Sequence, residues 1–397
     1  MALCRMRLQA SKDIAVASTM NRFARKHLVV MPLLALLAGC SLFGSSKAKP
    51  TPLTPITERL TVHTDWQASV GKAGNFSFLP ASGGPVVLAA SHDGTLIRLD
   101  NGKESWRTSA GQKLSSGTAS DGRLVVVGTY KGEVLAFDFE TGKSLWSAHV
   151  KGELVAPPAI TEGLLIVRTS DNRVIALDGN DGKQRWNYQR SNPPLAVRSL
   201  APPLPFGPFV LVGMPGGKLY ALALQNGAPA WEGTVSVPRG ATELDRVSDV
   251  VTVPVVQGPQ MCAVAFQGRA ACFDMQGGNQ MWSREVSSVA GITMDDRRVF
   301  VPDEQDVVHA FDRTTGASVW RQDRLKYRNL SAPVALPMGL IVADGEGFLH
   351  VLDRDTGEFT GRLNVGGGGV MTILPALAPN TVVLQTRNGT LMAVTLQ

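Results

Sequence analysis

The sequence predicts an all-β fold: an eight-bladed β-propeller with four antiparallel strands per blade. Two observations support this prediction. Tryptophan recurs at spacings of 40, 40, 40, 45, 51 and 38 residues, in the series Trp66, Trp106, Trp146, Trp186, Trp231, Trp282 and Trp320. Between the tryptophans lie short segments rich in Val, Ile and Leu and bounded by Gly, Asp or Asn, which is the pattern of a four-stranded β-meander. A sheet of this kind that repeats about every 40 residues is typical of a propeller blade.

Residues 1–39 have the pattern of a secretory signal. Arg22, Arg25 and Lys26 precede an apolar run that is too short to span a bilayer comfortably. Met20 begins a signal of ordinary length and is therefore an alternative start of the chain. The signal holds six Lys or Arg and one Asp, so it carries +5 of the net charge of +6. The rest of the chain is nearly neutral, which argues against nucleic acid as a partner.

The signal ends in Leu37-Ala38-Gly39-Cys40, which resembles the lipobox of bacterial lipoproteins. The resemblance implies cleavage before Cys40 and a covalent diacylglycerol and N-acyl lipid on this residue. Ser41 follows instead of Asp, and by the sorting rule of that class this favours the periplasmic face of the outer membrane. Residues 40–60 are rich in Gly, Ser and Pro, so we expect a lipidated, flexible tether ahead of the propeller at residues 61–397.

Each repeat contains a strand, a tight turn, a second strand that ends in Asp, a Gly turn and a Trp. The clearest copy contains, in order, a strand over 124–130, the turn Lys131-Gly132, a strand over 133–137, Asp138, Gly142 and Trp146. We expect the tight turn to be a two-residue hairpin that needs φ > 0. The aspartate is expected to accept hydrogen bonds from the next turn, and the tryptophan to fill the gap between neighbouring blades. All of these roles are architectural.

The two ends of the chain are expected to complete one blade. Trp66 lies on a lone strand over 65–70 before the first full repeat, and residues 381–397 supply strands with no tryptophan strand after them. Pairing of the N-terminal strand with the last blade gives eight blades and leaves no open edge at the seam. In the seventh repeat Gly361 stands where tryptophan is expected.

No motif of a catalytic or metal site is present in the sequence. The six histidines form no HExxH, and no GxSxG occurs. The glycines at 366–369 are not followed by Lys-Ser or Lys-Thr, so they are not a phosphate loop. We therefore predict no catalytic residue, no metal site and no enzyme activity.

Cys262 and Cys272 are the cysteines that remain after lipidation of Cys40. If Gln267-Gly268 is a two-residue turn, Cys262 faces Phe273, and the two sulfur atoms point to opposite faces of the sheet. The sequence thus predicts two free, mostly buried thiols.

The phrase D-x-x-[TD]-G-x-x-x-W resembles the repeat of quinoprotein-type propellers, whose enzymes bind pyrroloquinoline quinone and calcium at the ring axis. Those enzymes use an adjacent Cys–Cys pair in the cofactor cage, and this sequence has none. The resemblance implies the architecture. A quinone-dependent periplasmic oxidoreductase remains one alternative function, and a general periplasmic protein-interaction propeller is another.

The mature chain more closely resembles the BamB family of outer-membrane assembly lipoproteins. The resemblance covers the lipobox, the tether and the eight blades. Its most specific parts are residues 242–250 (TELDRVSDV) and residues 194–199 (PLAVRS). These stretches lie where the tryptophan spacing is longest, and insertions between blades emerge as loops on one propeller face.

The resemblance implies a non-catalytic scaffold of the outer-membrane β-barrel assembly (BAM) machinery, which assists folding and insertion of β-barrel proteins. It implies binding to the central β-barrel subunit, BamA, with unfolded outer-membrane proteins as a further candidate partner. The positions that match are Leu195, Val197, Arg198 and Asp249. An apolar pair supplies buried area, and an arginine offers a bidentate fork to a carboxylate.

Two further residues of the same stretch, Asp245 and Arg246, are expected to pair with each other and to hold the loop. The family has a second acid two residues after the position of Asp249, where this chain has Val251.

Overall fold

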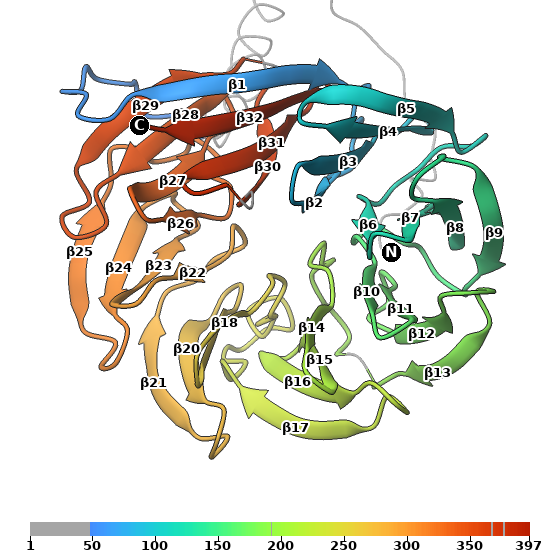
Figure 1. Cartoon of the computed structure of the whole chain (residues 1–397). Coiled ribbons are helices and arrows are strands. Elements are labelled where there is room, and N and C mark those ends of the chain that lie inside the picture. Colours follow the sequence, from blue (N-terminus) through green and yellow to red (C-terminus); the bar gives the residue numbers. More distant parts are fainter. Residues whose placement is uncertain (1–47, 192, 367, 376–377) are drawn as a thin grey trace, which may run out of the picture. The chain divides into compact units, whose positions relative to one another are not determined.

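The computed structural model describes residues 48–397, apart from residues 192, 367 and 376–377. The predicted signal, Cys40 and the first part of the predicted tether lie outside the described residues. Within this part of the chain, 32 strands form eight four-stranded antiparallel sheets, and no helix occurs. The sheets follow one another around a ring, which confirms the predicted eight-bladed propeller (Figure 1). No described segment forms a helix long and apolar enough to cross a membrane.

The blades are numbered along the chain, and the four strands of each blade are named in order, from the strand nearest the ring axis to the outermost one (Figure 1). Blade 1 consists of β2 (Ala81–Gly83), β3 (Val86–Ala90), β4 (Thr95–Asp100) and β5 (Lys103–Ser109), and blade 2 of β6 (Ala119–Ser120), β7 (Leu124–Gly128), β8 (Glu133–Asp138) and β9 (Ser144–His149). Blade 3 consists of β10 (Ala159–Thr161), β11 (Leu164–Arg168), β12 (Val174–Asp178) and β13 (Gln184–Tyr188), and blade 4 of β14 (Leu204–Phe206), β15 (Phe209–Met214), β16 (Lys218–Ala223) and β17 (Pro229–Thr234). Blade 5 consists of β18 (Val255–Gln257), β19 (Gln260–Val264), β20 (Arg269–Asp274) and β21 (Gln280–Glu285). Blade 6 consists of β22 (Thr293–Met294), β23 (Arg298–Pro302), β24 (Val308–Asp312) and β25 (Ser318–Gln322). Blade 7 consists of β26 (Val334–Leu336), β27 (Gly339–Ala343), β28 (Phe348–Leu352) and β29 (Phe359–Asn364). Blade 8 consists of β30 (Val370–Pro375), β31 (Thr381–Thr386), β32 (Thr390–Leu396) and β1 (Val62–Ser69).

The two ends of the chain close the ring in blade 8. The N-terminal β1 pairs with β32 along its whole length, from Val62 opposite Leu396 to Ser69 opposite Thr390. The backbone of Thr61 and Gln397 exchanges two hydrogen bonds, of 2.8 and 2.9 Å. This confirms the predicted closure: the N-terminus supplies one strand of blade 8 and the C-terminus the other three, so the two chain ends are joined in one sheet.

Tryptophans seal the seams between neighbouring blades, as predicted. The indole of Trp106 in blade 1 donates to the carbonyl of Phe139 in blade 2 at 2.9 Å. A Cβ on Gly142 would lie 2.9 Å from the same ring, so only glycine admits the indole at this turn. The carboxylate of Asp138 accepts from the Thr141 amide at 2.8 Å and from the Thr141 hydroxyl at 2.6 Å, which lowers the pKa of Asp138. The same arrangement recurs around the ring, so the repeated residues are architectural.

The hairpins between second and third strands have three-residue loops, not the two-residue turns expected. In blade 2 the amide of Thr129 bonds to the carbonyl of Glu133 at 2.9 Å, which leaves residues 130–132 in the loop. In blade 5 the amide of Ala265 bonds to the carbonyl of Arg269 at 2.9 Å, which leaves residues 266–268. The additional loop residue shifts the strand register by one position.

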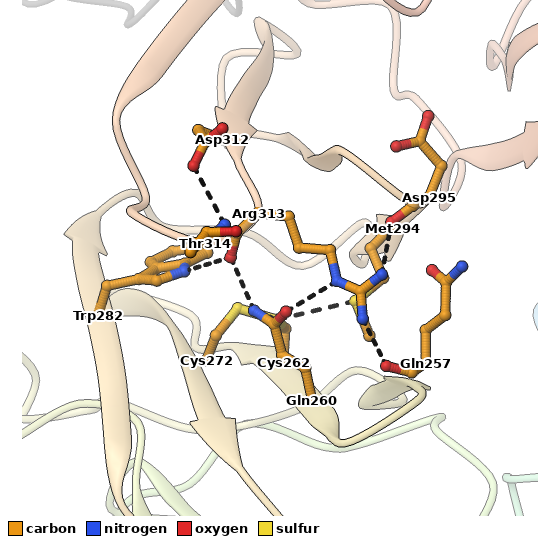
Figure 2. Close-up of a disulfide and its surroundings, with 10 residues drawn as sticks. All are labelled: Gln257, Gln260, Cys262, Cys272, Trp282, Met294, Asp295, Asp312, Arg313 and Thr314. Atoms are coloured by element: carbon orange, nitrogen blue, oxygen red, sulfur yellow. Dashed lines mark hydrogen bonds between the residues drawn. A yellow bond between two sulfur atoms is a disulfide. The ribbon is translucent and has the colours of Figure 1, made fainter.

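That shift makes the prediction of free thiols wrong. Cys262 lies directly opposite Cys272, with Cα atoms 4.1 Å apart, and the two side chains form a disulfide. Figure 2 shows it beside Gln260, whose side-chain oxygen accepts a hydrogen bond of 2.8 Å from Arg313. Both cysteines are fully buried, so the predicted burial is confirmed.

Blade 7 lacks its tryptophan because the seam beyond it is built differently. In the other blades the indole packs on the glycine turn between the third and fourth strands of the next blade. Blade 8 has no such turn, because its third strand, β32, and its fourth strand, β1, come from opposite ends of the chain. A Cβ on Gly361 would lie 2.8 Å from a methyl group of Val62 and 3.2 Å from the carbonyl of Leu60. The N-terminal segment fills the place of the indole.

Residues 51–60 form a strap on blade 7, so the predicted flexible tether is wrong for this part. The Thr51 amide donates to the Lys326 carbonyl at 2.9 Å, and Arg328 and Arg362 donate to the Thr51 and Thr54 carbonyls at 2.8 and 2.9 Å. Leu53 and Ile56 pack on a core cluster shared by blades 6 and 7. Apolar packing and backbone hydrogen bonds outweigh the Pro-rich composition that suggested a free linker.

Candidate partner-binding face

The six residues predicted to bind a partner lie on two connections between blades. Residues 189–203 join β13 to β14, and residues 235–254 join β17 to β18. Because neighbouring strands are antiparallel, these connections emerge at the same end of the sheets as the turns between second and third strands. Asp249 exchanges backbone hydrogen bonds of 3.2 and 2.8 Å with Phe266 in such a turn. We call this side of the ring, with its connections and turns, the connection face.

Asp249 ties the two connections together. Its side chain is buried, and one carboxylate oxygen accepts from the Val197 amide at 2.6 Å. The other oxygen accepts from the Gly216 amide at 2.9 Å, in the turn of blade 4. A buried carboxylate needs such donors, and here the backbone supplies them. Asp249 therefore ties the backbone of the first connection, at Val197, to the turn of blade 4.

Arg168, at the end of β11, lies buried below the same connections. Its guanidinium donates to the Ser199 hydroxyl at 2.9 Å and to the Asn172 side-chain oxygen at 2.8 Å. Desolvation lowers the pKa of Arg168 to about 10, while the charge of Asp249 acts in the opposite direction. The arginine remains charged at neutral pH.

Arg198 projects from the connection but has contacts within the chain. It donates to Glu153 at 2.5 Å, and its guanidinium lies 5.2 Å from the centre of the Tyr130 ring. Glu153 is on the connection between β9 and β10, so Arg198 spans two neighbouring connections. Its side chain is 42% exposed, so part of the planar fork faces outwards.

Apolar side chains are exposed beside Arg198. Leu195 is 46% exposed, Leu200 is 45% exposed and Val197 is half-buried. Exposed apolar groups together with an arginine are the composition of an interface centre. Leu195, Val197 and Arg198 thus lie within four residues of one another on the connection, and each is at least partly exposed.

Asp245 and Arg246 do not form the expected pair. The Asp245 carboxylate accepts from the Thr242 amide at 3.0 Å, and the Asp245 amide donates to the Thr242 hydroxyl at 3.1 Å. Arg246 donates to the Gly240 carbonyl at 3.0 Å and to Glu243 at 3.5 Å. The expected result, a loop held by its own side chains, is present with different partners. Leu244 at its tip is 67% exposed.

Val251 lies at the edge of a cavity of about 260 Å³ among the inner ends of the connections. The cavity is lined mainly by apolar side chains, among them Leu200, Val253, Val289 and Ile292. At the position of the family's second acid, this chain therefore adds to an apolar surface.

Three residues of the face were not identified from the sequence: Arg168, Glu153 and Tyr130. Glu153 and Tyr130 occur in ordinary loop sequence and give no signal. Arg168 does give one, because it ends the otherwise apolar segment Leu164–Val167. A charge inside a buried strand is uncommon and needs partners.

No group of three or more His, Cys, Asp or Glu among the described residues is arranged to hold a metal ion.

Comparison with known proteins defines the family. The family model described as "Outer membrane protein assembly factor BamB" matches residues 92–322 and 304–397. The chain belongs to the BamB family.

Individual BamB proteins match nearly the whole chain. Outer membrane protein assembly factor BamB of Bordetella pertussis is 42% identical over 376 residues, which cover 94% of this chain and 97% of the relative. The crystal structure of BamB from Moraxella catarrhalis superposes with a TM-score of 0.79 at 28% identity, over 84% of this chain and all of the other. Quinohemoprotein alcohol dehydrogenase from Comamonas testosteroni has a TM-score of 0.67 at 11% identity, over 84% of this chain and 76% of the other, and shares the fold alone.

Proposed function

We propose that this chain is a non-catalytic scaffold of outer-membrane β-barrel assembly, anchored by lipid on Cys40 to the periplasmic face of the outer membrane. Its connection face docks on the central β-barrel subunit of the assembly machinery, BamA. Unfolded outer-membrane proteins are a further partner. The role requires no cofactor besides the covalent lipid. Membership of the BamB family, whose members are named outer membrane protein assembly factors, supports the assembly role.

One observation carries the choice of docking face. The carboxylate of Asp249 holds the amides of Val197 and Gly216, so the backbone that carries Leu195 and Arg198 is held in place at Val197. A segment that is ordered before binding loses little conformational entropy when a partner docks. Leu195 offers apolar area and Arg198 offers a fork for a carboxylate, so the partner surface should combine an apolar patch with an acid.

Co-purification from detergent-solubilised outer membrane tests this proposal. The variant L195A/R198A removes the exposed leucine and the arginine, and we expect recovery of the barrel subunit to fall at least about tenfold. The matched control L145A/R123A removes an exposed leucine of β9 and an exposed arginine of the turn before β7, away from the connection face. We expect this control to recover the subunit as the parent chain does.

The outcomes separate the alternatives. Unchanged recovery with L195A/R198A would contradict docking through this face. Recovery of a different protein without the barrel subunit would favour a general interaction module. Chain loaded with pyrroloquinoline quinone and Ca²⁺ is expected not to reduce a dye with an alcohol or a sugar, and turnover would contradict the non-catalytic role.

A further inference from the structure

The repeat supplies an internal comparison for Arg168. Arg168 is the last residue of the second strand of blade 3, and the amide of the next residue donates the hydrogen bond that closes the three-residue hairpin loop. In six blades the residue after the second strand donates this hydrogen bond. The residues that end the second strand in the other five blades are Ala90, Gly128, Val264, Pro302 and Ala343. All five are small or apolar, and all six places are buried. Blade 3 alone among these six places a charge here, so the fold does not require one.

Burial of Arg168 is costly, and its own blade does not compensate fully. The side chain is 2% exposed, and its Nε has no hydrogen-bond partner among the described residues. Of the two described side chains that accept hydrogen bonds from its guanidinium, only Asn172 belongs to the same blade. A buried guanidinium without a complete set of acceptors destabilises a domain relative to an apolar residue. A function outside the packing of blade 3 is the simplest reason for this residue.

The contacts of Arg168 lead to both docking connections. The Ser199 hydroxyl accepts from Arg168 and donates to the Val251 carbonyl at 3.1 Å, which joins residues 189–203 to residues 235–254. Asp249, two residues before Val251, provides the opposite charge and holds the Val197 amide. Arg168, Ser199 and Asp249 therefore form one buried frame below the exposed Leu195 and Arg198.

We propose that Arg168 is a positioning residue of the docking face, which acts through Ser199 and Asp249 to hold Leu195 and Arg198 in the arrangement that the partner binds. The proposal rests on the proposed function for its consequence in binding. Its structural part, the order of residues 195–199, is independent of any partner. An apolar replacement should leave the propeller folded, because apolar residues occupy the same place in other blades.

The test compares Arg168→Met with Arg328→Met. Arg328 is an equally buried arginine, which binds Asp344 and the Thr51 carbonyl far from the two docking connections. Hydrogen exchange of the Val197 and Gly216 amides reports the frame directly, and affinity for the purified barrel subunit reports docking. For R168M we expect both amides to exchange at least about tenfold faster and affinity to fall about tenfold. For R328M we expect stability to fall while amide exchange and affinity stay within about twofold.

Ser199→Ala provides a second variant that removes only the bridging hydroxyl, and we expect the same changes at smaller size. If R168M and S199A leave the exchange of Val197 unchanged, the proposal is overturned. It is also overturned if R168M and R328M weaken binding equally at matched loss of stability. If the parent chain does not bind the barrel subunit at all, the proposed function fails, and the exchange of Val197 alone decides whether Arg168 positions the connection.

Discussion

Removal of the Cys262–Cys272 disulfide is expected to destabilise the propeller by about 2.7 kcal/mol. The bond closes a loop over a sequence separation of 10, and the chain-entropy relation for a loop of this length gives about 2.7 kcal/mol at 25 °C. A chain that lacks residues 1–40 has these two cysteines only. Urea unfolding of this chain, oxidised and then reduced, isolates the effect of the cross-link from any change in packing.

The double variant C262A/C272A serves as the control for the sulfur atoms. We expect it to be at least as unstable as the reduced chain, because it also loses buried contacts with the Met294 sulfur, which lies 4.0 Å from Cys262. A count of thiols in urea without reductant gives an independent answer, and we expect none. Two titratable thiols under these conditions, or equal stability of the oxidised and reduced chains, would refute the reasoning and favour the register of a two-residue turn, in which Cys262 faces Phe273.

Three further predictions concern the seams, the anchor and acid. Trp186→Ala should cost about 3–5 kcal/mol and more than Trp146→Ala, because Trp186 is 7% exposed and Trp146 only half-buried; urea midpoints measured by circular dichroism compare them. Cys40→Ser should move the protein from the membrane fraction to the soluble periplasmic extract, and persistent sedimentation of the variant with membranes would contradict lipid anchoring. Hydrogen bonds from Thr141 lower the pKa of Asp138, so its contribution to stability is present above 3.8 and is lost as the pH falls through the lowered value. Urea midpoints of Asp138→Asn should therefore change less than those of the parent between neutral pH and about pH 2, and parallel curves would contradict the assignment.

The sequence predicts the fold well because the residues that seal the ring are large, rare and periodic. Trp106 and Gly142 identify a seam from spacing alone, and the structure places them in contact. Loop length between strands is not visible in this way. A Lys-Gly or Gln-Gly pair fits a two-residue turn and a three-residue loop equally, and the choice decides whether Cys262 faces Cys272 or Phe273.

The candidate site is predicted less completely, for a physical reason. Leu195 and Arg198 are found from the resemblance because they lie in an insertion that interrupts the repeat. Arg168 lies 27 residues before Leu195 in the chain, inside a regular strand, and only the tertiary structure brings it below that insertion. Asp249 was assigned to the partner surface, but the structure shows its two oxygens occupied by backbone amides within the chain.

In a repeat protein, a residue that departs from the repeat needs a physical explanation. Gly361 and Arg168 both depart from the repeat, and the explanations differ. Gly361 replaces a tryptophan, and Leu60 of the strap and Val62 of β1 fill the space, so closure of the ring accounts for the replacement. Arg168 replaces a small or apolar residue, yet ring closure takes place in blade 8 and not in blade 3, and the Nε of Arg168 has no hydrogen-bond partner in the described part of the chain. Arg168 instead donates to the Ser199 hydroxyl, which donates to the Val251 carbonyl and so joins the two connections that carry the docking residues. A substitution that costs packing energy at a place where the ring does not need it is best explained by the surface that it holds in position.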